Sequence, residues 1–486
     1  MQKPKAQDLS RFLSDEAKSR KPSLLKEAFV HTLTPGMCSL GGGLPLPSLF
    51  PWDRLTAKAL VPPFNEGNDV NILNAEETFT IVVDKETGEH EDDVPLKVAL
   101  QYGRSEGDFR LKGFIDEHTK LIHNIGFEDW DTIVTCGNTF AWDAVLRTLT
   151  NRGDSILVEE FSFSSALETA HAQGVTTVGV KMDLEGIIPS ALDEQLTKWV
   201  GPKPKFLYTI PTGQNPTGSC VDSTRRKQIY EIIQKHDLLL VEDEPYYYLQ
   251  MPAYEYGAKI DKSKPSSHQE FIKSLVPSYL TFDTDGRVLR LDSFSKVLAP
   301  GSRIGWIVAQ KTFIERFGRL LETSSQSSSG FSTSLVNGLL QRWGQQGYID
   351  WLIRLRETYT EKRNICCDAI IDHMPKGSYE LCPPVAGMFF WLKMDARRYK
   401  HFADLNDSVH DTEMALYLNG IQSLVQLAPG QWFWADQKTN PPQPEIPRTE
   451  DEKCSIFYRG TFASVPGPKL VEAIQRWAAV VKEYYV

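Results

Sequence analysis

The chain has 486 residues, of which 41% are hydrophobic and 24% charged, and its formal net charge is −10. Its length predicts two to three domains, and its composition is typical of a soluble globular protein with a large core. The acidic charge argues against nucleic-acid binding, which usually needs a basic surface. There is no apolar run of membrane-spanning length, and the charged start lacks a secretory signal. We therefore expect a cytoplasmic protein that binds neither nucleic acid nor membrane.

Cysteine and histidine show no pattern of metal ligands. The seven cysteines are scattered without a CxxC pair, and the ten histidines form no HExxH motif. We therefore expect reduced thiols and no metal site.

The first part of the chain is irregular. Residues 1–60 are predicted to form an N-terminal arm, with a short helix at "SDEAKSR", and a substrate-loop segment of the small domain that includes the Gly/Pro-rich stretch "SLGGGLPLPSLFPW". Residues 61–98 are rich in acidic and turn residues, and "TFTIVVDKETGEHEDD" within them predicts a surface hairpin. This insertion suggests an interface or a lineage-specific addition as readily as a functional element.

Residues 99–345 alternate between strand and helix patterns and are predicted to form the large domain. Apolar strands are expected at 132–137, 155–160, 176–182, 204–211, 238–245, 287–295 and 303–309. Helices are expected at 138–150, 164–174 and 223–237. This alternation predicts an α/β fold with a mostly parallel sheet between two layers of helices. Ligands bind at the carboxyl ends of the strands in such sheets.

Residues 346–486 are predicted to form a smaller α+β domain. A long helix is expected at 348–374, strands at 386–394, 423–430 and 454–463, and a final helix at 468–485. A polar, proline-rich surface loop is expected at 436–453.

The stretch "DSFSKVLAPGSRIGW" holds one lysine, Lys296, among Ser293, Ser295 and Arg303. An unprotonated lysine amine can bond covalently to an aldehyde, and burial or a nearby cation lowers a lysine pKa. The serine hydroxyls could bind a phosphate. A surface lysine after a strand is the alternative interpretation.

Three other polar positions follow predicted strands. Asn215 lies in the rigid "YTIPTGQNPTG" loop, and Asp243 ends a buried strand three residues before Tyr246. A buried carboxylate needs a partner, for which a protonated ring nitrogen would serve, although Asp243 could also cap a helix. The helix that begins at Asn138 and Thr139 could bind a phosphate at its N-terminus, although capping alone would also explain Asn138.

In this order the motifs resemble one family. "NPTG", "DEPYY" and "SFSKxxxPGxRxGW" resemble the fold-type I pyridoxal-phosphate (PLP) aminotransferases of class I/II. "SRKPS", "ALQYGRSEG" and "SFSSAL" look like the fungal aromatic amino acid aminotransferases and the related kynurenine/2-aminoadipate aminotransferases. The resemblance implies a large PLP-binding domain with a mostly parallel seven-stranded sheet, and a smaller α+β domain.

The resemblance also implies a role for each cofactor residue. Lys296 would form the aldimine with PLP and move the substrate proton, with Asp243 on the ring nitrogen and Tyr246 on the ring hydroxyl. The implied cofactor-binding residues are Lys296, Tyr102, Asn138, Thr139, Phe163, Asn215, Asp243, Tyr246, Ser293, Ser295 and Arg303. Phe163 would stack on the ring, with Phe161 as the rival candidate. Relatives often have Ser or Gly where this chain has Asn138 and Thr139, so their backbone N–H groups are the expected phosphate donors.

Substrate residues follow from the same resemblance. The implied set is Arg459, Arg20, Gly42, Gly43, Leu44 and Asn215. Arg459 would bind the α-carboxylate, and Arg20 would pair with an acidic side chain or move aside for an aromatic one. Tyr102 would reach the phosphate of a second subunit, which implies a homodimer with shared active sites.

The implied reaction is ping-pong transamination of aromatic amino acids, namely phenylalanine, tyrosine, tryptophan or kynurenine, and of 2-aminoadipate. The acceptors would be 2-oxoglutarate or aromatic 2-oxo acids. A carbon–sulfur β-lyase on the same scaffold and a non-enzymatic regulator with a PLP fold are the alternatives.

Overall fold

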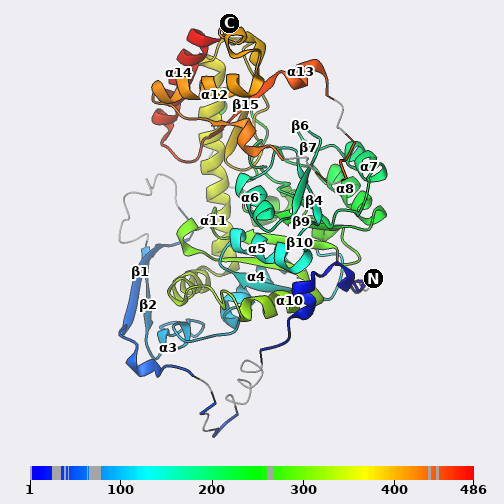
Figure 1. The fold of residues 1–486 in the computed structure, drawn as a ribbon. Coiled ribbons are helices and arrows are strands. Elements are labelled where there is room, and N and C mark those ends of the chain that lie inside the picture. Colours follow the sequence, from blue (N-terminus) through cyan, green and yellow to red (C-terminus); the bar gives the residue numbers. More distant parts are fainter. Residues whose placement is uncertain are drawn as a thin grey trace. The chain divides into compact units, whose positions relative to one another are not determined.

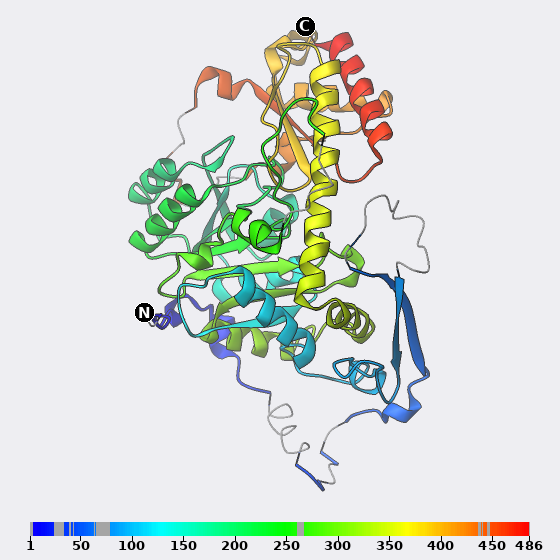
Figure 2. The same ribbon diagram turned by 180° about the vertical axis from the view of Figure 1, so that it is seen from behind.

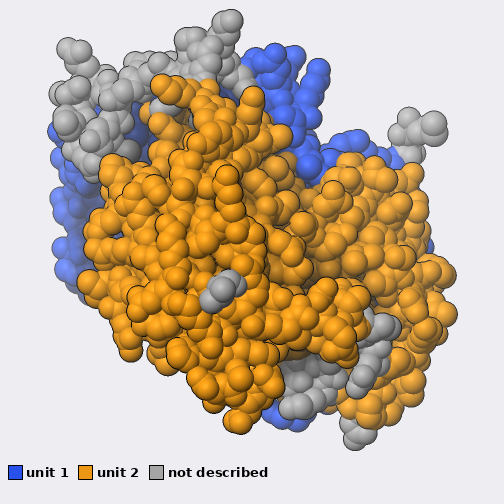
Figure 3. Space-filling view, turned by 90° about the horizontal axis from the view of Figure 1, so that it is seen from above, with its two compact units in different colours: residues 1–152, 238–245, 266–353 blue, residues 153–237, 246–265, 354–486 orange. Residues whose placement is uncertain are grey.

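The structure is a computed structural model that describes residues 3–23, 34–37, 40–41, 43–62, 64, 78–259, 267–435, 439, 441–444 and 448–485. The chain forms two compact units (Figure 3). Unit 1 comprises residues 1–152, 238–245 and 266–353, and unit 2 comprises residues 153–237, 246–265 and 354–486. These units divide the predicted large domain, 99–345, so the predicted domain boundaries stay a prediction. Across the described residues, no helix has the length and apolar character needed to span a membrane.

The main sheet has seven strands in the order β3-β11-β10-β9-β8-β4-β5. Their bounds are β3 Trp130–Thr135, β4 Ser155–Glu159, β5 Thr176–Val180, β8 Phe206–Thr209, β9 Leu239–Asp243, β10 Val288–Ser293 and β11 Gly305–Gln310. β11 runs antiparallel to both neighbours, whereas the pairs β10–β9, β4–β5 and β4–β8 are parallel. Every residue of β9, β10 and β11 is buried. The predicted mostly parallel seven-stranded sheet is thus confirmed.

The helices in the described part of unit 1 differ in what they pack against. They are α1 Asp15–Ser19, α3 Leu96–Ala99, α4 Phe109–Ile122, α5 Asn138–Leu149, α9 His268–Ser274, α10 Lys311–Glu322 and the start of α11 Gly330–His373. α5 packs on β10 and β11, while α4 and α10 pack on β3. α11 begins earlier than the predicted 348, and it has a non-helical residue at Gly344.

The hairpin of unit 1 differs in part from the prediction. β1 Arg54–Leu60 pairs antiparallel with β2 Thr78–Asp84 beside α3 (Figures 1 and 2). β2 meets the segment that follows it, as predicted, through a single antiparallel bridge between Val83 and Gly88. Its main partner is β1, which lies before residue 61, where the predicted insertion begins. The sequence of β1, "RLTAKAL", shows only a weak alternation of apolar and polar residues, because two of its inward residues are small alanines. In β2 the inward residues include the larger Ile81 and Val83, which are buried.

Unit 2 carries β4, β5 and β8 with α6 Ser164–Ala172, α7 Pro189–Thr197 and α8 Ser223–Lys235, and the short pair β6 Met182–Asp183 and β7 Gly186–Ile187. Its second sheet has the order β12-β13-β15-β14, with bounds β12 Glu380–Leu381, β13 Phe389–Asp395, β14 Ala428–Pro429 and β15 Ser455–Thr461. α12 Val409–Gln422 and α14 Gly467–Tyr484 share one core with this sheet, and α13 Glu450–Lys453 precedes β15. The strand predicted at 423–430 shrinks to β14.

Candidate active site

Lys296 lies in the turn between β10 and β11 of unit 1. The two strands are antiparallel, and Ser293 pairs with Gly305 at their ends. The Ser293 hydroxyl donates to the Ser295 hydroxyl at 2.8 Å and accepts from the Ser295 backbone N–H at 3.0 Å. Partial burial, and then the charge of Arg303, lower the pKa of Lys296. The sequence therefore folds into a turn that holds a partly buried lysine amine whose pKa lies below that of a free lysine.

Arg303 brings a cation to the start of α5. It adopts the left-handed conformation (φ 51°), and its Nη2 donates to the Cys136 carbonyl at 3.0 Å. Gly137 precedes α5 at φ 89°, and a Cβ there would lie 2.5 Å from Arg303 Nη2. Only glycine therefore allows this close approach. The first N–H groups of α5, at Asn138 and Thr139, have no carbonyl partner within the helix, so guanidinium and N–H groups together suit a phosphate.

The Asn138 side chain has a role that sequence reasoning missed. Its Nδ2 donates to Asp243 Oδ1 at 2.7 Å and to the Leu291 carbonyl at 3.1 Å. Asp243 ends β9 and is 6% exposed. The Asn138 amide thus holds a buried carboxylate, which leaves the backbone N–H groups of α5 for the predicted anion. No local signal could have found this pair, because 105 residues separate its members.

Unit 2 brings Asn215 and Arg459 together. Arg459 lies on β15, and its Nη1 donates to Asn215 Oδ1 at 2.8 Å. Its guanidinium carbon lies 4.5 Å from the centre of the Phe389 ring and 4.6 Å from that of Phe433. Burial lowers the pKa of Arg459, but an arginine keeps its charge at neutral pH. The arrangement can bind a carboxylate beside aromatic rings; sequence reasoning did not find Phe389 and Phe433.

The aromatic candidates of unit 2 fall into two environments. Tyr246 is buried, and its ring meets that of Phe389 edge-on at 5.8 Å. Phe161 is buried in a cluster with Trp391 and Phe433. Phe163 immediately precedes α6 and is only partly buried. Phe161 is therefore occupied in a core, and Phe163 stays the candidate for stacking on a ring.

The remaining predicted residues of unit 1 that the structure describes differ in exposure. Tyr102 is 57% exposed, as a residue that reaches a second subunit would be. Arg20 immediately follows α1 and is partly buried: it pairs with Glu16 at 2.5 Å, and its Nη1 donates to Thr323 Oγ1. Three further predicted site residues of unit 1 are exposed to solvent: Thr139, Gly43 and Leu44. Gly42 lies outside the described residues.

Known proteins match the chain over nearly its whole length. The family described as aminotransferase class I and II matches residues 99–421. The chain belongs to this family. It is 44% identical to an aromatic amino acid aminotransferase of Schizosaccharomyces pombe over 98% of both chains, and 30% identical to the mitochondrial kynurenine/alpha-aminoadipate aminotransferase of Bos taurus over 98% of this chain and 99% of that one. Among solved structures, aminotransferase Aro8 of Candida albicans has a TM-score of 0.93 and 47% identity, with 99% of each chain covered.

Family membership fixes the cofactor and the reaction type. Aminotransferases of class I and II depend on PLP and catalyse transamination. The residues of unit 1 fit this cofactor, because a half-buried lysine with a lowered pKa, a held carboxylate and a cation at a helix start are the groups that its aldehyde, ring nitrogen and phosphate require.

Proposed function

We propose that this aminotransferase takes the amino group from aromatic amino acids (phenylalanine, tyrosine, tryptophan and kynurenine) and from 2-aminoadipate. The amino acceptors are 2-oxoglutarate and aromatic 2-oxo acids. The observation that carries the proposal is Arg459, which donates a hydrogen bond to Asn215 at 2.8 Å beside the Phe389 and Phe433 rings and so offers a carboxylate a partner next to aromatic surface. The substrate class is supported by relatives that are named as aromatic amino acid and kynurenine/alpha-aminoadipate aminotransferases.

We assign the cofactor roles by the resemblance together with the contacts in each unit. Bound PLP supplies an electron sink for the negative charge that develops at the substrate Cα. Asp243, held by Asn138, pairs with the ring nitrogen and keeps that nitrogen protonated. The phosphate is bound by the backbone N–H groups of Asn138 and Thr139 and by the side chains of Ser293, Ser295 and Arg303. Asn215 and Tyr246 bind the ring hydroxyl, Phe163 stacks on the ring, and Tyr102 of a second subunit reaches the phosphate.

Lys296 also carries the proton. Its amine would hold PLP in the resting enzyme, and, once free, it would be the base that accepts the proton from the substrate Cα and the acid that gives it back. A base works best when its pKa lies near the working pH. Burial and Arg303 move the pKa of Lys296 in that direction.

Arg459 binds the α-carboxylate of both substrates. Its two-pronged guanidinium matches a carboxylate, and Phe389 and Phe433 flank it and restrict its movement. The same two rings offer an apolar contact to an aromatic side chain. By the resemblance alone, we assign Gly43 and Leu44 to contacts with that side chain.

Arg20 distinguishes acidic from aromatic substrates. Its pair with Glu16 is the state for aromatic side chains, and release from Glu16 lets it meet the side-chain carboxylate of 2-aminoadipate. This change requires Arg20 to give up its bonds to Glu16 and to Thr323, while Glu16 keeps its ion pair with Arg147 at 2.7 Å. The enzyme acts as a cytoplasmic homodimer with shared active sites.

Product analysis tests the reaction. The purified enzyme is incubated with phenylalanine or 2-aminoadipate, with and without 2-oxoglutarate. We expect glutamate and the new 2-oxo acid in equal amounts, only when the acceptor is present, and neither with the Lys296→Ala variant. Release of ammonia and pyruvate from a cysteine conjugate without any acceptor would instead establish the β-lyase alternative.

A further inference from the structure

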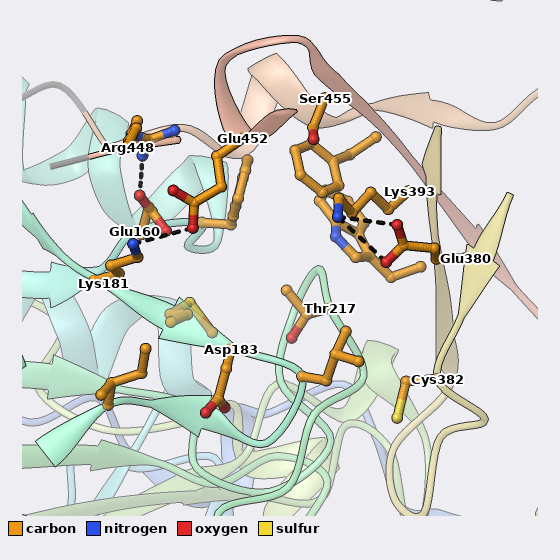
Figure 4. Close-up of a pocket in the computed structure, with 16 residues that line it drawn as sticks. Glu160, Lys181, Asp183, Thr217, Glu380, Cys382, Lys393, Arg448, Glu452 and Ser455 are labelled. Atoms are coloured by element: carbon orange, nitrogen blue, oxygen red, sulfur yellow. Dashed lines mark hydrogen bonds and ion pairs between the residues drawn. The ribbon is translucent and has the colours of Figure 1, made fainter. Parts of the chain in front are cut away.

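Unit 2 contains a cavity that none of the roles above uses. Its volume is about 410 Å³, within the range of small-molecule sites. It lies where β13 and β15 of the second sheet meet the segments that follow β4 and β5 (Figure 4). Three aromatic rings line it, those of Phe161, Trp391 and Phe457. Trp391 and Phe457 stack at 5.3 Å with 15° between their planes, so they present an ordered aromatic wall.

Charged side chains line the same cavity in balanced pairs. Arg448 pairs with Glu160, Lys181 with Glu452 at 3.0 Å, and Lys393 with Glu380 at 3.1 Å, as Figure 4 shows. The remaining lining carboxylate, Asp183, shares Arg225 with Glu185, at 2.6 and 2.8 Å. The lining thus offers both cations and carboxylates, which suits a ligand that carries both charges.

The lining polar groups include one that is nearly buried. The Glu160 side chain is 9% exposed and ion-paired with Arg448, whose guanidinium lies 4.2 Å from the Trp434 ring. In contrast, Glu380 is 66% exposed, and such a pair with Lys393 contributes little stability. Lys393 can therefore exchange Glu380 for another carboxylate at low cost.

We propose that this cavity binds a zwitterionic aromatic amino acid at a site separate from Arg459. The ring of the ligand packs against Trp391 and Phe457, and the apolar side chains of Met182, Leu184 and Ile188 supply further contacts. The carboxylate of the ligand accepts from Lys393, and its ammonium group pairs with the released Glu380. The inference rests on the lining of the cavity and does not require that the same amino acid be a substrate.

The cavity shares a wall with the carboxylate site. Trp391 lies opposite Arg459 in the β13–β15 register, and Lys393 lies opposite Phe457, so all four side chains share one face of the sheet. Trp391 also packs against Phe433 at 6.2 Å, and the Phe433 ring flanks Arg459. A ligand that packs on Trp391 therefore contacts the aromatic cluster that flanks Arg459. We expect binding of this ligand to change the KM for the amino acid substrate.

The test has two steps on the holoenzyme. Borohydride first reduces the bond between Lys296 and PLP, and loss of the visible absorption band reports on that proposed bond independently of the cavity. The reduced enzyme is then titrated with L-tryptophan in a calorimeter to test the cavity. We expect one molecule of L-tryptophan per chain to bind even in the Arg459→Ala variant, and Lys393→Met to weaken this binding about tenfold or more, as for the loss of a charged hydrogen bond. Lys198→Met is the matched control, because Lys198 forms an exposed pair with Glu194 elsewhere.

A second variant blocks the cavity without removing a charge. Leu184→Trp should abolish binding, whereas Leu424→Trp should not, because Leu424 is an exposed leucine outside the cavity. Thermal unfolding of each variant shows that it is folded. The proposal is overturned if no L-tryptophan binds at about 1 mM, if both cavity variants bind it like the unchanged enzyme, or if Arg459→Ala alone removes the binding, which would assign it to the substrate site.

Discussion

The hydrogen bond from Asn138 to Asp243 makes a specific prediction about cofactor affinity. Asn138 donates to Asp243 at 2.7 Å and to the Leu291 carbonyl at 3.1 Å. Asn138→Ala removes both bonds and leaves the backbone of α5 in place. In our proposal Asp243 pairs with the ring nitrogen of PLP. A variant in which Asn138 no longer orients the Asp243 carboxylate should therefore bind PLP more weakly.

The size of the effect follows from the type of bond. A hydrogen bond to a charged group contributes about 1.5–3 kcal/mol, and each 1.4 kcal/mol is a factor of ten in affinity. We therefore expect PLP to dissociate from the Asn138→Ala variant roughly 10- to 100-fold more readily. Asn138→Asp should bind PLP more weakly still, because its carboxylate cannot donate and repels Asp243.

The assay is a titration of apoenzyme with PLP, followed by the visible absorption of the lysine-bound cofactor and by its dependence on pH. Asn419→Ala is the matched control, because it removes a bond to the Tyr399 hydroxyl at 3.3 Å in unit 2 and should leave PLP affinity unchanged. A dissociation constant for Asn138→Ala within about twofold of the unchanged enzyme would refute the assigned role.

Three further predictions concern the substrate and acid stability. Arg459→Lys should lower kcat/KM for phenylalanine and for 2-aminoadipate alike by about 10- to 100-fold, mainly through KM, because lysine cannot bind a carboxylate bidentately; an effect on one substrate only would contradict this. Arg20→Met should lower kcat/KM about tenfold for 2-aminoadipate but not for phenylalanine, and equal losses would show that Arg20 serves only its pair with Glu16. Burial lowers the pKa of His118 to about 4, so between pH 6.5 and 4 the unfolded chain binds a proton that the folded chain does not, and about 3 kcal/mol of unfolding free energy is lost as the pH falls. His118→Gln should lose that much less over the same interval in urea unfolding, and equal losses would exclude His118 as the cause.

Local sequence predicted the parts of the fold that are made by neighbouring residues. The turn that holds Lys296 joins two strands that are adjacent in the sheet, so its serines and Arg303 could be assigned from one stretch. The start of α5 at Asn138 could also be predicted locally, because Gly137 directly precedes a helical pattern in the sequence.

Contacts between distant segments could not be predicted in this way. Whether Asn138 meets Asp243, or Arg459 meets Asn215, depends on how strands far apart in the chain are ordered. The turn residues after β2 predicted its bridge to Gly88, but not its longer pairing with β1, because a long segment separates β1 from β2 in the chain. The ion pair of Arg20 with Glu16 was accessible to sequence reasoning, since four residues separate them on α1 and its cap, whereas the contact with Thr323 was not.

The most direct test of the central claim is the absorbance spectrum of the purified enzyme before and after phenylalanine is added without any 2-oxo acid. We predict a visible band from PLP bound to Lys296, which phenylalanine converts to the near-ultraviolet band of the aminated cofactor. Lys296→Ala should lack the lysine-bound band. If the enzyme shows no visible band even after incubation with PLP, the proposed bond between Lys296 and the cofactor is wrong. If phenylalanine leaves the band unchanged, the proposed transamination of aromatic amino acids is wrong.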